Sequence, residues 1–255
     1  MPDSMQDRNE ISGGSAIAAL DNDRKITIAP WWHTALLVAP LLGFSLLGSI
    51  RPAHRALGEH HETQYLITLV WEWILAALVL WGISMRRVPL RQLLGKRRPT
   101  LNDWRDDFIL ALSFWLAASI LLAAIGVTLK LAHFSMPTKT IAQLAPQNAW
   151  QLTVWIFLSI SAGICEELVF RGYLLQQFTR ASGRVWIGVL VSSLLFGVAH
   201  GYEGASGMIA ITIYGSLFCL LAMKRDSLRP GMIAHAWHDI FSGVALMLLK
   251  HARVF

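Results

Sequence analysis

Residues 162–175 read AGICEELVFRGYLL, and this stretch places two adjacent carboxylates, Glu166 and Glu167, and one guanidinium, Arg171, inside an apolar run. A charged side chain in the hydrocarbon core of a membrane is costly unless a partner or a water-filled cavity compensates it. Charges embedded in this way are therefore candidates for function, provided that the chain around them lies in a membrane.

The composition indicates a membrane protein. Of the 255 residues, 55% are hydrophobic and 15% are charged, whereas a soluble domain carries about 25% charged residues. A helix needs about 20 apolar residues to cross the hydrocarbon core. Seven segments approach that length, and the fifth and sixth are short for full spans: 31–50, 65–84, 107–129, 151–178, 185–200, 207–223 and 232–249. We therefore predict an all-α polytopic bundle with its active site among the last four segments.

The distribution of charge predicts the orientation of the chain. Residues 1–28 are polar and predict a disordered tail. N-terminal membrane helices should follow at 29–130, and a helical core that holds the site at 131–255. Most of the 22 lysine and arginine residues lie in the tail or in connections on the same side, which predicts a cytoplasmic N-terminus. The membrane we expect is a bacterial inner or plasma membrane. The connection 86–105, RRVPLRQLLGKRRPTLNDWR, either sets this topology alone or also contacts anionic lipid. No basic stretch has the interleaved aromatics of a nucleic-acid surface, so we expect no nucleic-acid partner.

The two glutamates have different neighbours on a helix. Glu167 and Arg171 are four residues apart and share a face, so they form a natural ion pair. Glu166 points about 100° away around the helix axis, and no partner stands four residues from it on either side. A carboxylate without a partner in an apolar cavity is a candidate general base for water. The alternative is that both acids only form an ion-pair cluster that holds helices together.

Two histidines in later segments are candidates for the same site. The run LLFGVAH ends at His200, and the run RPGMIAHAWHD places His235 and Asp239 four residues apart, where the carboxylate can orient the imidazole. A base with two histidines can hydrolyse a peptide bond, and Glu166, His200 and His235 could also hold Zn²⁺ or another divalent metal. Neither HExxH nor GxSxG occurs in the sequence. Glu72 is a further embedded acid, and its place near the end of its span suggests that it reaches the interface.

Three motifs in order carry a resemblance to a known family. EELVFR fits EExxxR, FGVAH fits FxxxH and HAWHD fits HxxxN/D. Over residues 150–250 the chain resembles the CAAX protease and bacteriocin-processing (Abi) family, which includes type II CAAX prenyl endopeptidases. The resemblance implies an intramembrane endopeptidase in which Glu166 activates water. It assigns His200, His235 and Asp239 to the scissile carbonyl, and Glu167 and Arg171 to the rest of the first motif. It leaves open a metal-free or a metal-assisted reaction.

The predicted partners are a peptide or protein substrate and the lipid bilayer. A non-catalytic immunity or scaffold protein of the same family, with the polar cluster used for binding or folding, is the alternative. Residue counts place Glu166 and His235 at different depths in the membrane. A tilted fifth segment or an inward dip at 224–231 would let them meet, and we expect Glu166 to lie within about 12 Å of each motif histidine, His200 and His235.

Overall fold

The structure is a computed structural model that describes residues 27–50, 61–95, 99–136 and 138–252. This part of the chain is helical and contains no strand, which confirms the all-α prediction. The predicted disordered tail lies outside the described residues except for its last two positions. Thr27 and Ile28 are both buried, and the neighbouring Ala29 donates its backbone N–H to Gln177. The packed part of the protein therefore begins earlier than the composition suggested.

All seven predicted apolar segments are helical. Five helical stretches are long and apolar enough to cross a membrane, and Trp31–Leu47 and Val185–Ala199 are shorter apolar helices. The sixth segment is longer than predicted, because residues 201–206 at its start and 224–225 at its end extend it to 25 residues. The elements in chain order are α2 (Trp31–Ile50), α3 (His61–Met85), α4 (Leu90–Leu94), α5 (Leu101–Leu131), α6 (Thr138–Leu144), α7 (Ala149–Glu166), η2 (Glu167–Leu174), α8 (Leu175–Ser182), α9 (Val185–Ala199), η3 (Gly201–Glu203), α10 (Gly204–Arg225) and α11 (Arg229–His251). We conclude that the chain is an integral membrane protein.

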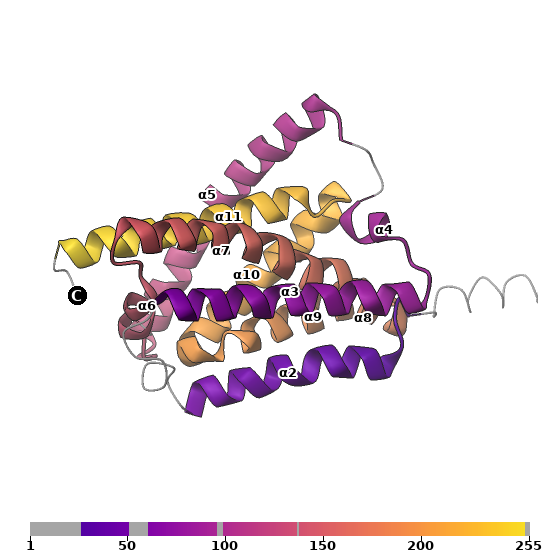
Figure 1. The fold of residues 1–255 in the computed structure, drawn as a ribbon, viewed down its shortest axis with the longest axis horizontal. Coiled ribbons are helices and arrows are strands. Elements are labelled where there is room, and N and C mark those ends of the chain that lie inside the picture. Colours follow the sequence, from indigo (N-terminus) through magenta and orange to yellow (C-terminus); the bar gives the residue numbers. More distant parts are fainter. Residues whose placement is uncertain (1–26, 51–60, 96–98, 137, 253–255) are drawn as a thin grey trace, which may run out of the picture.

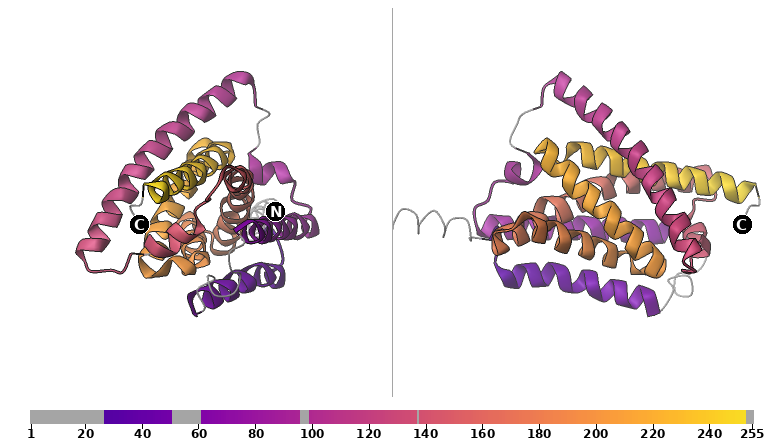
Figure 2. Two further views of the ribbon diagram at one scale, coloured as in Figure 1. Left: turned by 60° about the vertical axis from the view of Figure 1, so that its left-hand side comes forward. Right: turned by 180° about the vertical axis from the view of Figure 1, so that it is seen from behind.

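The long helices run back and forth along one axis of the molecule. In Figure 1, α2, α3, α7, α9 and α11 lie along the long axis, and α5 crosses them obliquely. Figure 2 shows α5 on the outside of the bundle, where it packs on α10 and α11. One end, here called the tail-side end, holds the start of α2, α4 and the turns at 183–184 and 226–228. The opposite end holds α6 and the C-terminal end of α11.

Local sequence explains where several helices begin and end. The Thr100 side chain accepts the backbone N–H of Asp103, whose carboxylate accepts the Thr100 N–H, so a capping box starts α5. The Asn148 side chain caps α7 by accepting the N–H of Gln151 at 2.9 Å. The α8 helix ends at Gly183, whose φ of 67° is left-handed and suits glycine.

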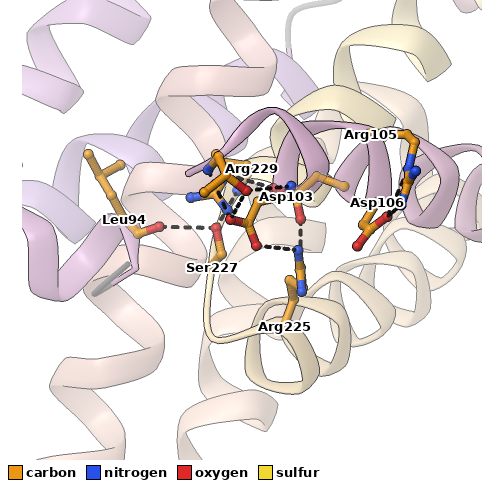
Figure 3. Close-up of polar contacts among 9 residues, drawn as sticks. Leu94, Asp103, Arg105, Asp106, Arg225, Ser227 and Arg229 are labelled. Atoms are coloured by element: carbon orange, nitrogen blue, oxygen red, sulfur yellow. Dashed lines mark hydrogen bonds and ion pairs between the residues drawn. The ribbon is translucent and has the colours of Figure 1, made fainter. Parts of the chain in front are cut away.

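An ion cluster anchors α5 to the turn between α10 and α11. Asp107 is fully buried, and its two carboxylate oxygens accept hydrogen bonds of 2.6 Å from Arg225 Nε and Arg229 Nε. Asp103 adds an ion pair of 3.7 Å to Arg225. Figure 3 shows Asp103, Arg225 and Arg229 converging beside Ser227 at this turn. Each Asp107 oxygen has its own arginine, which offsets the cost of burying the charge.

The span that carries the two glutamates changes its winding at Glu167. The α7 helix continues directly into the π-helix η2, and all eight η2 residues are buried. Segments of π-helix are rare and are frequently found at functional sites. Just before this point Gly163 faces α11, where a Cβ would lie 2.7 Å from the Met232 carbonyl oxygen. The absence of a side chain at Gly163 thus lets α7 and α11 approach at the level of the glutamates.

Candidate active site

The imidazole of His235 lies between the two adjacent glutamates. Its Nδ1 is 3.1 Å from Glu167 Oε1, in hydrogen-bonding geometry, and its Nε2 is 3.6 Å from Glu166 Oε2. For His235, the expectation of a distance within about 12 Å of Glu166 is therefore met. The two carboxylates point in different directions from the helix, yet both contact His235, because each approaches a different nitrogen of its ring.

The partner of Glu167 indicates which ring nitrogen carries a proton. Arg171 Nη1 lies 3.0 Å from Glu167 Oε1, with both side chains fully buried, which confirms the predicted ion pair. A carboxylate paired in this way is ionised and can only accept a hydrogen bond. His235 Nδ1–H must then be the donor to Glu167. This leaves Nε2 on the side of Glu166.

Aromatic rings and a backbone carbonyl enclose Arg171. Its guanidinium carbon lies 4.2 Å from the centre of the Phe196 ring and 4.9 Å from that of Phe218. Its Nη2 donates to the Gly215 carbonyl oxygen at 3.3 Å. Cation–π contacts of a desolvated guanidinium contribute about 2 kcal/mol or more. The Arg171 side chain therefore links η2 to α9 and α10 while it neutralises Glu167.

Glu166 has a different environment from Glu167. Its side chain is 22% exposed, whereas that of Glu167 is fully buried, and in both residues Oε2 is buried without a hydrogen-bond partner among the described residues. Glu166 lines a cavity of about 640 Å³ that is also lined by His200, His235 and Asp239. The structure thus brings all four residues that were predicted as catalytic to one cavity. Glu167 and Arg171 lie behind its wall and do not line it.

His200 ends α9 and is held by its own helix. Its Nδ1 donates to the Phe196 carbonyl oxygen at 2.9 Å, because a carbonyl can only accept. Among the described residues its Nε2 has no hydrogen-bond partner. The ring packs against Phe196 and Tyr202, with centroid distances of 4.9 and 5.9 Å. His200 therefore presents a fixed ring to the cavity with Nε2 unbonded.

Asp239 was predicted to orient the imidazole of His235, but it lies too far from the ring to form a hydrogen bond with it. Its Oδ2 lies 3.8 Å from His235 Nε2, beyond hydrogen-bond distance, and the hydrogen bond that orients the ring comes from Glu167. The helix around Asp239 is fixed by Trp155, whose Nε1 donates to the Asp239 carbonyl oxygen at 2.8 Å. Asp239 thus stands on the same side of the ring as Glu166.

The cavity contains acids that the sequence reading did not assign to it. Glu72 was expected to reach the membrane interface, but it is only 5% exposed and accepts a hydrogen bond of 3.0 Å from Ser161. It lines the cavity from α3, as Glu203 does from η3. A signal for Glu72 existed, because an acid in a membrane span is a functional candidate by default.

The π-helix helps to explain how residues of different apparent depth meet. A π-helix closes i→i+5 hydrogen bonds, so it takes more residues per turn and rises less per residue than an α-helix. Counting at α-helical rise through Glu167–Leu174 therefore overstates the distance of Glu166 from the tail-side end. Gly163 against Met232 and Ala236 then fixes the level at which α7 and α11 touch.

The donor groups in the cavity do not form a metal site. Within the described ranges, no three His, Cys, Asp or Glu side chains are arranged so that they could hold a metal ion. Glu166 and His235 lie close together, but His200 does not complete a set with them.

Comparisons with known proteins agree with the motif reading. Residues 148–241 match the family model described as type II CAAX prenyl endopeptidase Rce1-like, which confirms the predicted family. The chain is also similar to an uncharacterized 24.3 kDa protein of Escherichia coli, with 27% identity over 128 residues. That alignment covers 48% of this chain and 58% of the relative, so the chain spans little more than half of that protein's length. No solved structure matches.

Proposed function

From the type II CAAX prenyl endopeptidase Rce1-like domain at residues 148–241, we propose that this protein is an intramembrane endopeptidase that uses a glutamate-activated water. One observation carries the proposal. Glu166 Oε2 is buried without a hydrogen-bond partner among the described residues, 3.6 Å from His235, in a cavity that His200 also lines. A carboxylate left unbonded in this way is free to accept a proton from water.

In the proposed reaction, Glu166 takes a proton from a water molecule as the water oxygen attacks the scissile carbonyl carbon. The C–N bond then breaks, and Glu166 returns the proton to the leaving amine, so the base acts in turn as the acid. Negative charge develops on the carbonyl oxygen in the transition state. Donors aimed at that oxygen supply a large share of the rate enhancement in acyl transfer.

The histidines have the geometry for this second task. His235 donates from Nδ1 to Glu167, so it can donate to the oxyanion only from a protonated Nε2. Glu166 at 3.6 Å and Asp239 at 3.8 Å would stabilise the positive charge on that ring. Asp239 has no proton to donate when ionised, and we propose that its role is electrostatic. His200 would approach the oxyanion from α9.

We propose further that the substrate is a membrane-associated or hydrophobic peptide or protein tail. The cavity lies between helices of a bundle that exposes many large apolar side chains, as a lipid-facing surface does. The N-terminus is proposed to face the cytoplasm of a bacterial cell, on the basis of the positive-inside bias. Residues 131–255 are proposed as the catalytic unit.

The test compares cells that produce the wild-type protein with cells that produce Glu166→Gln. Peptides of the membrane and secreted fractions are quantified, together with the new N-termini that cleavage creates. We expect a defined set of N-termini to disappear in Glu166→Gln while the amount of inserted protein stays unchanged. Glutamine keeps the size of the side chain but is not a base.

The matched control is Asp106→Asn, which removes a carboxylate that lies outside the cavity, exposed and paired with Arg105. This variant should leave the set of N-termini unchanged. If Glu166→Gln produces the same N-termini as the wild type at equal protein level, Glu166 is not the base. A binding or scaffold role would then account for the polar cluster.

A further inference from the structure

A second cavity lies at the tail-side end of the bundle, away from the candidate active site. Its volume is about 720 Å³, and α4, α8 and the turn between α10 and α11 line it. Three arginines, Arg91, Arg171 and Arg180, contribute to its walls, against one carboxylate, Asp226. Because Arg171 is paired with Glu167, the excess positive charge comes from Arg91 and Arg180, and the cavity is basic, in contrast to the acidic cavity around Glu166.

Two of these arginines, Arg91 and Arg180, carry a positive charge that is not paired with a carboxylate among the described residues. Arg91 on α4 is exposed and Arg180 on α8 is half-buried. Neither guanidinium has an ion-pair or hydrogen-bond partner among the described residues. Arg171, which lines the inner wall, is 2% exposed, and its Nε is buried without a hydrogen-bond partner in the described part of the chain. Unpaired guanidinium groups around one cavity favour an anion, above all phosphate.

Hydrogen bonds join the elements that form the walls of the cavity, and no ligand is needed for them. Gln92 Nε2 donates to Gln176 Oε1 at 3.3 Å, and Gln176 Nε2 donates to the Gln92 carbonyl oxygen at 3.1 Å. The Leu228 backbone N–H donates to the Leu94 carbonyl oxygen at 3.2 Å. These bonds join α4 to α8 and to the α10–α11 turn. A site that is already assembled loses less entropy on binding.

The surroundings indicate where the phosphate comes from. Trp31 and Trp186 are exposed at the same end of the bundle, as tryptophans are at the headgroup level of a membrane. The cavity also has apolar wall residues, among them Leu93, Leu175 and Val185, which suit the glycerol and upper acyl region of a lipid. Lys96, Arg97 and Arg98 of the basic connection lie outside the described residues.

We infer that the cavity between α4, α8 and the α10–α11 turn binds a phosphate group through Arg91 and Arg180, and that an anionic phospholipid headgroup supplies it. This binding does not depend on the proposed peptidase activity. It gives the basic connection at 86–105 a specific role beyond setting topology, because Arg91 belongs to that connection.

The test is native mass spectrometry of the full-length protein, purified in neutral detergent and stripped of lipid. Phosphatidylglycerol and phosphatidylcholine with identical acyl chains are titrated separately, and inorganic phosphate is titrated as a third arm. We expect one phosphatidylglycerol per protein to bind more tightly than phosphatidylcholine. The double variant Arg91→Gln/Arg180→Gln should weaken that binding by about tenfold or more.

The control double variant Arg86→Gln/Arg184→Gln removes the same charge from exposed arginines at the same end that do not line the cavity. It should bind phosphatidylglycerol as the wild type does. Arg91→Gln alone changes only an exposed side chain, so it should fold even if the double variant does not, and it should show part of the loss.

The outcomes separate the two sources of phosphate. Preference for phosphatidylglycerol with no effect of inorganic phosphate supports the lipid headgroup. Saturation by inorganic phosphate that depends on Arg91 and Arg180 supports the same site with a free anion as its ligand. Equal binding of the two lipids, or equal loss in both double variants, overturns the inference.

Discussion

Two carboxylates of this protein, Asp107 and Glu166, have opposite surroundings. Asp107 at the tail-side end has an arginine nitrogen 2.6 Å from each of its oxygens. Glu166 has one histidine at 3.6 Å and a buried oxygen without a hydrogen bond among the described residues. A fully paired acid holds elements together, whereas an acid left without full pairing is available to react. The difference in pairing thus separates a structural acid from a catalytic candidate where composition does not.

The largest expected effect is on activity, at the histidines that complete the Glu166 cavity. His200→Ala and His235→Ala should each lower the rate of cleavage by about 10²- to 10³-fold, because each removes a group proposed to stabilise the oxyanion. The rate is measured on a substrate identified by the comparison of N-termini. Wild-type rates in both variants would show that the two histidines do not stabilise the oxyanion.

The next effect is on stability, at the paired acid. Asp107→Asn leaves Arg225 and Arg229 without their shared charge and should destabilise the fold by about 3 kcal/mol. It should leave the activity of the folded fraction unchanged. Thermal unfolding in detergent measures the first change, and the rate per folded molecule measures the second. A loss of activity with unchanged stability would reverse the roles assigned to the two acids.

A smaller effect is expected where α7 and α11 touch. Gly163→Ala places a Cβ 2.7 Å from the Met232 carbonyl oxygen, so α11 must shift and carry His235 away from Glu166. We expect about a tenfold loss of rate, since small displacements of catalytic groups are costly. Gly126→Ala is the control, because a Cβ there has no atom within 4 Å. Equal rates in the two variants would show that the contact does not position the site.

The smallest effect is expected from metal removal. Because the described donors do not form a metal site, dialysis against a chelator should leave the cleavage rate unchanged within about twofold. Rates before and after dialysis, with metal analysis of the same samples, test this. Loss of activity that zinc restores would show that a metal completes the site.

Much of the fold and part of the site followed from the sequence. Hydropathy located all seven helical segments, and spacing alone identified the Glu167–Arg171 pair, because both signals are local. The contacts of His235 were not local. Its ring is held by Glu167 from another helix, whereas spacing within α11 pointed to Asp239. Which of several acids meets a histidine depends on how helices pack, and a single sequence does not carry that information.

Glu72 is a second residue whose contacts could not be predicted from the sequence. Its segment was located correctly, but its position near a span end suggested the interface, and the buried hydrogen bond to Ser161 contradicts this. Ser161 lies 89 residues away in the sequence. The π-helix was also not foreseen, because Glu167–Leu174 has no composition that distinguishes it from an α-helix.

The π-helix makes the protein sensitive to chain length at one place. A π-helix places more residues in each turn than an α-helix does, so the number of residues in Glu167–Leu174 sets how α8 is rotated against α7, and removing one residue would change that rotation. Gln177, which bonds both Ala29 and Thr34 with its amide, would then face elsewhere. Exchanges of similar side chains can be absorbed here, whereas a single insertion or deletion changes the phase between the glutamates and the α2 contacts. Evolution in this span should therefore proceed by substitution at constant length.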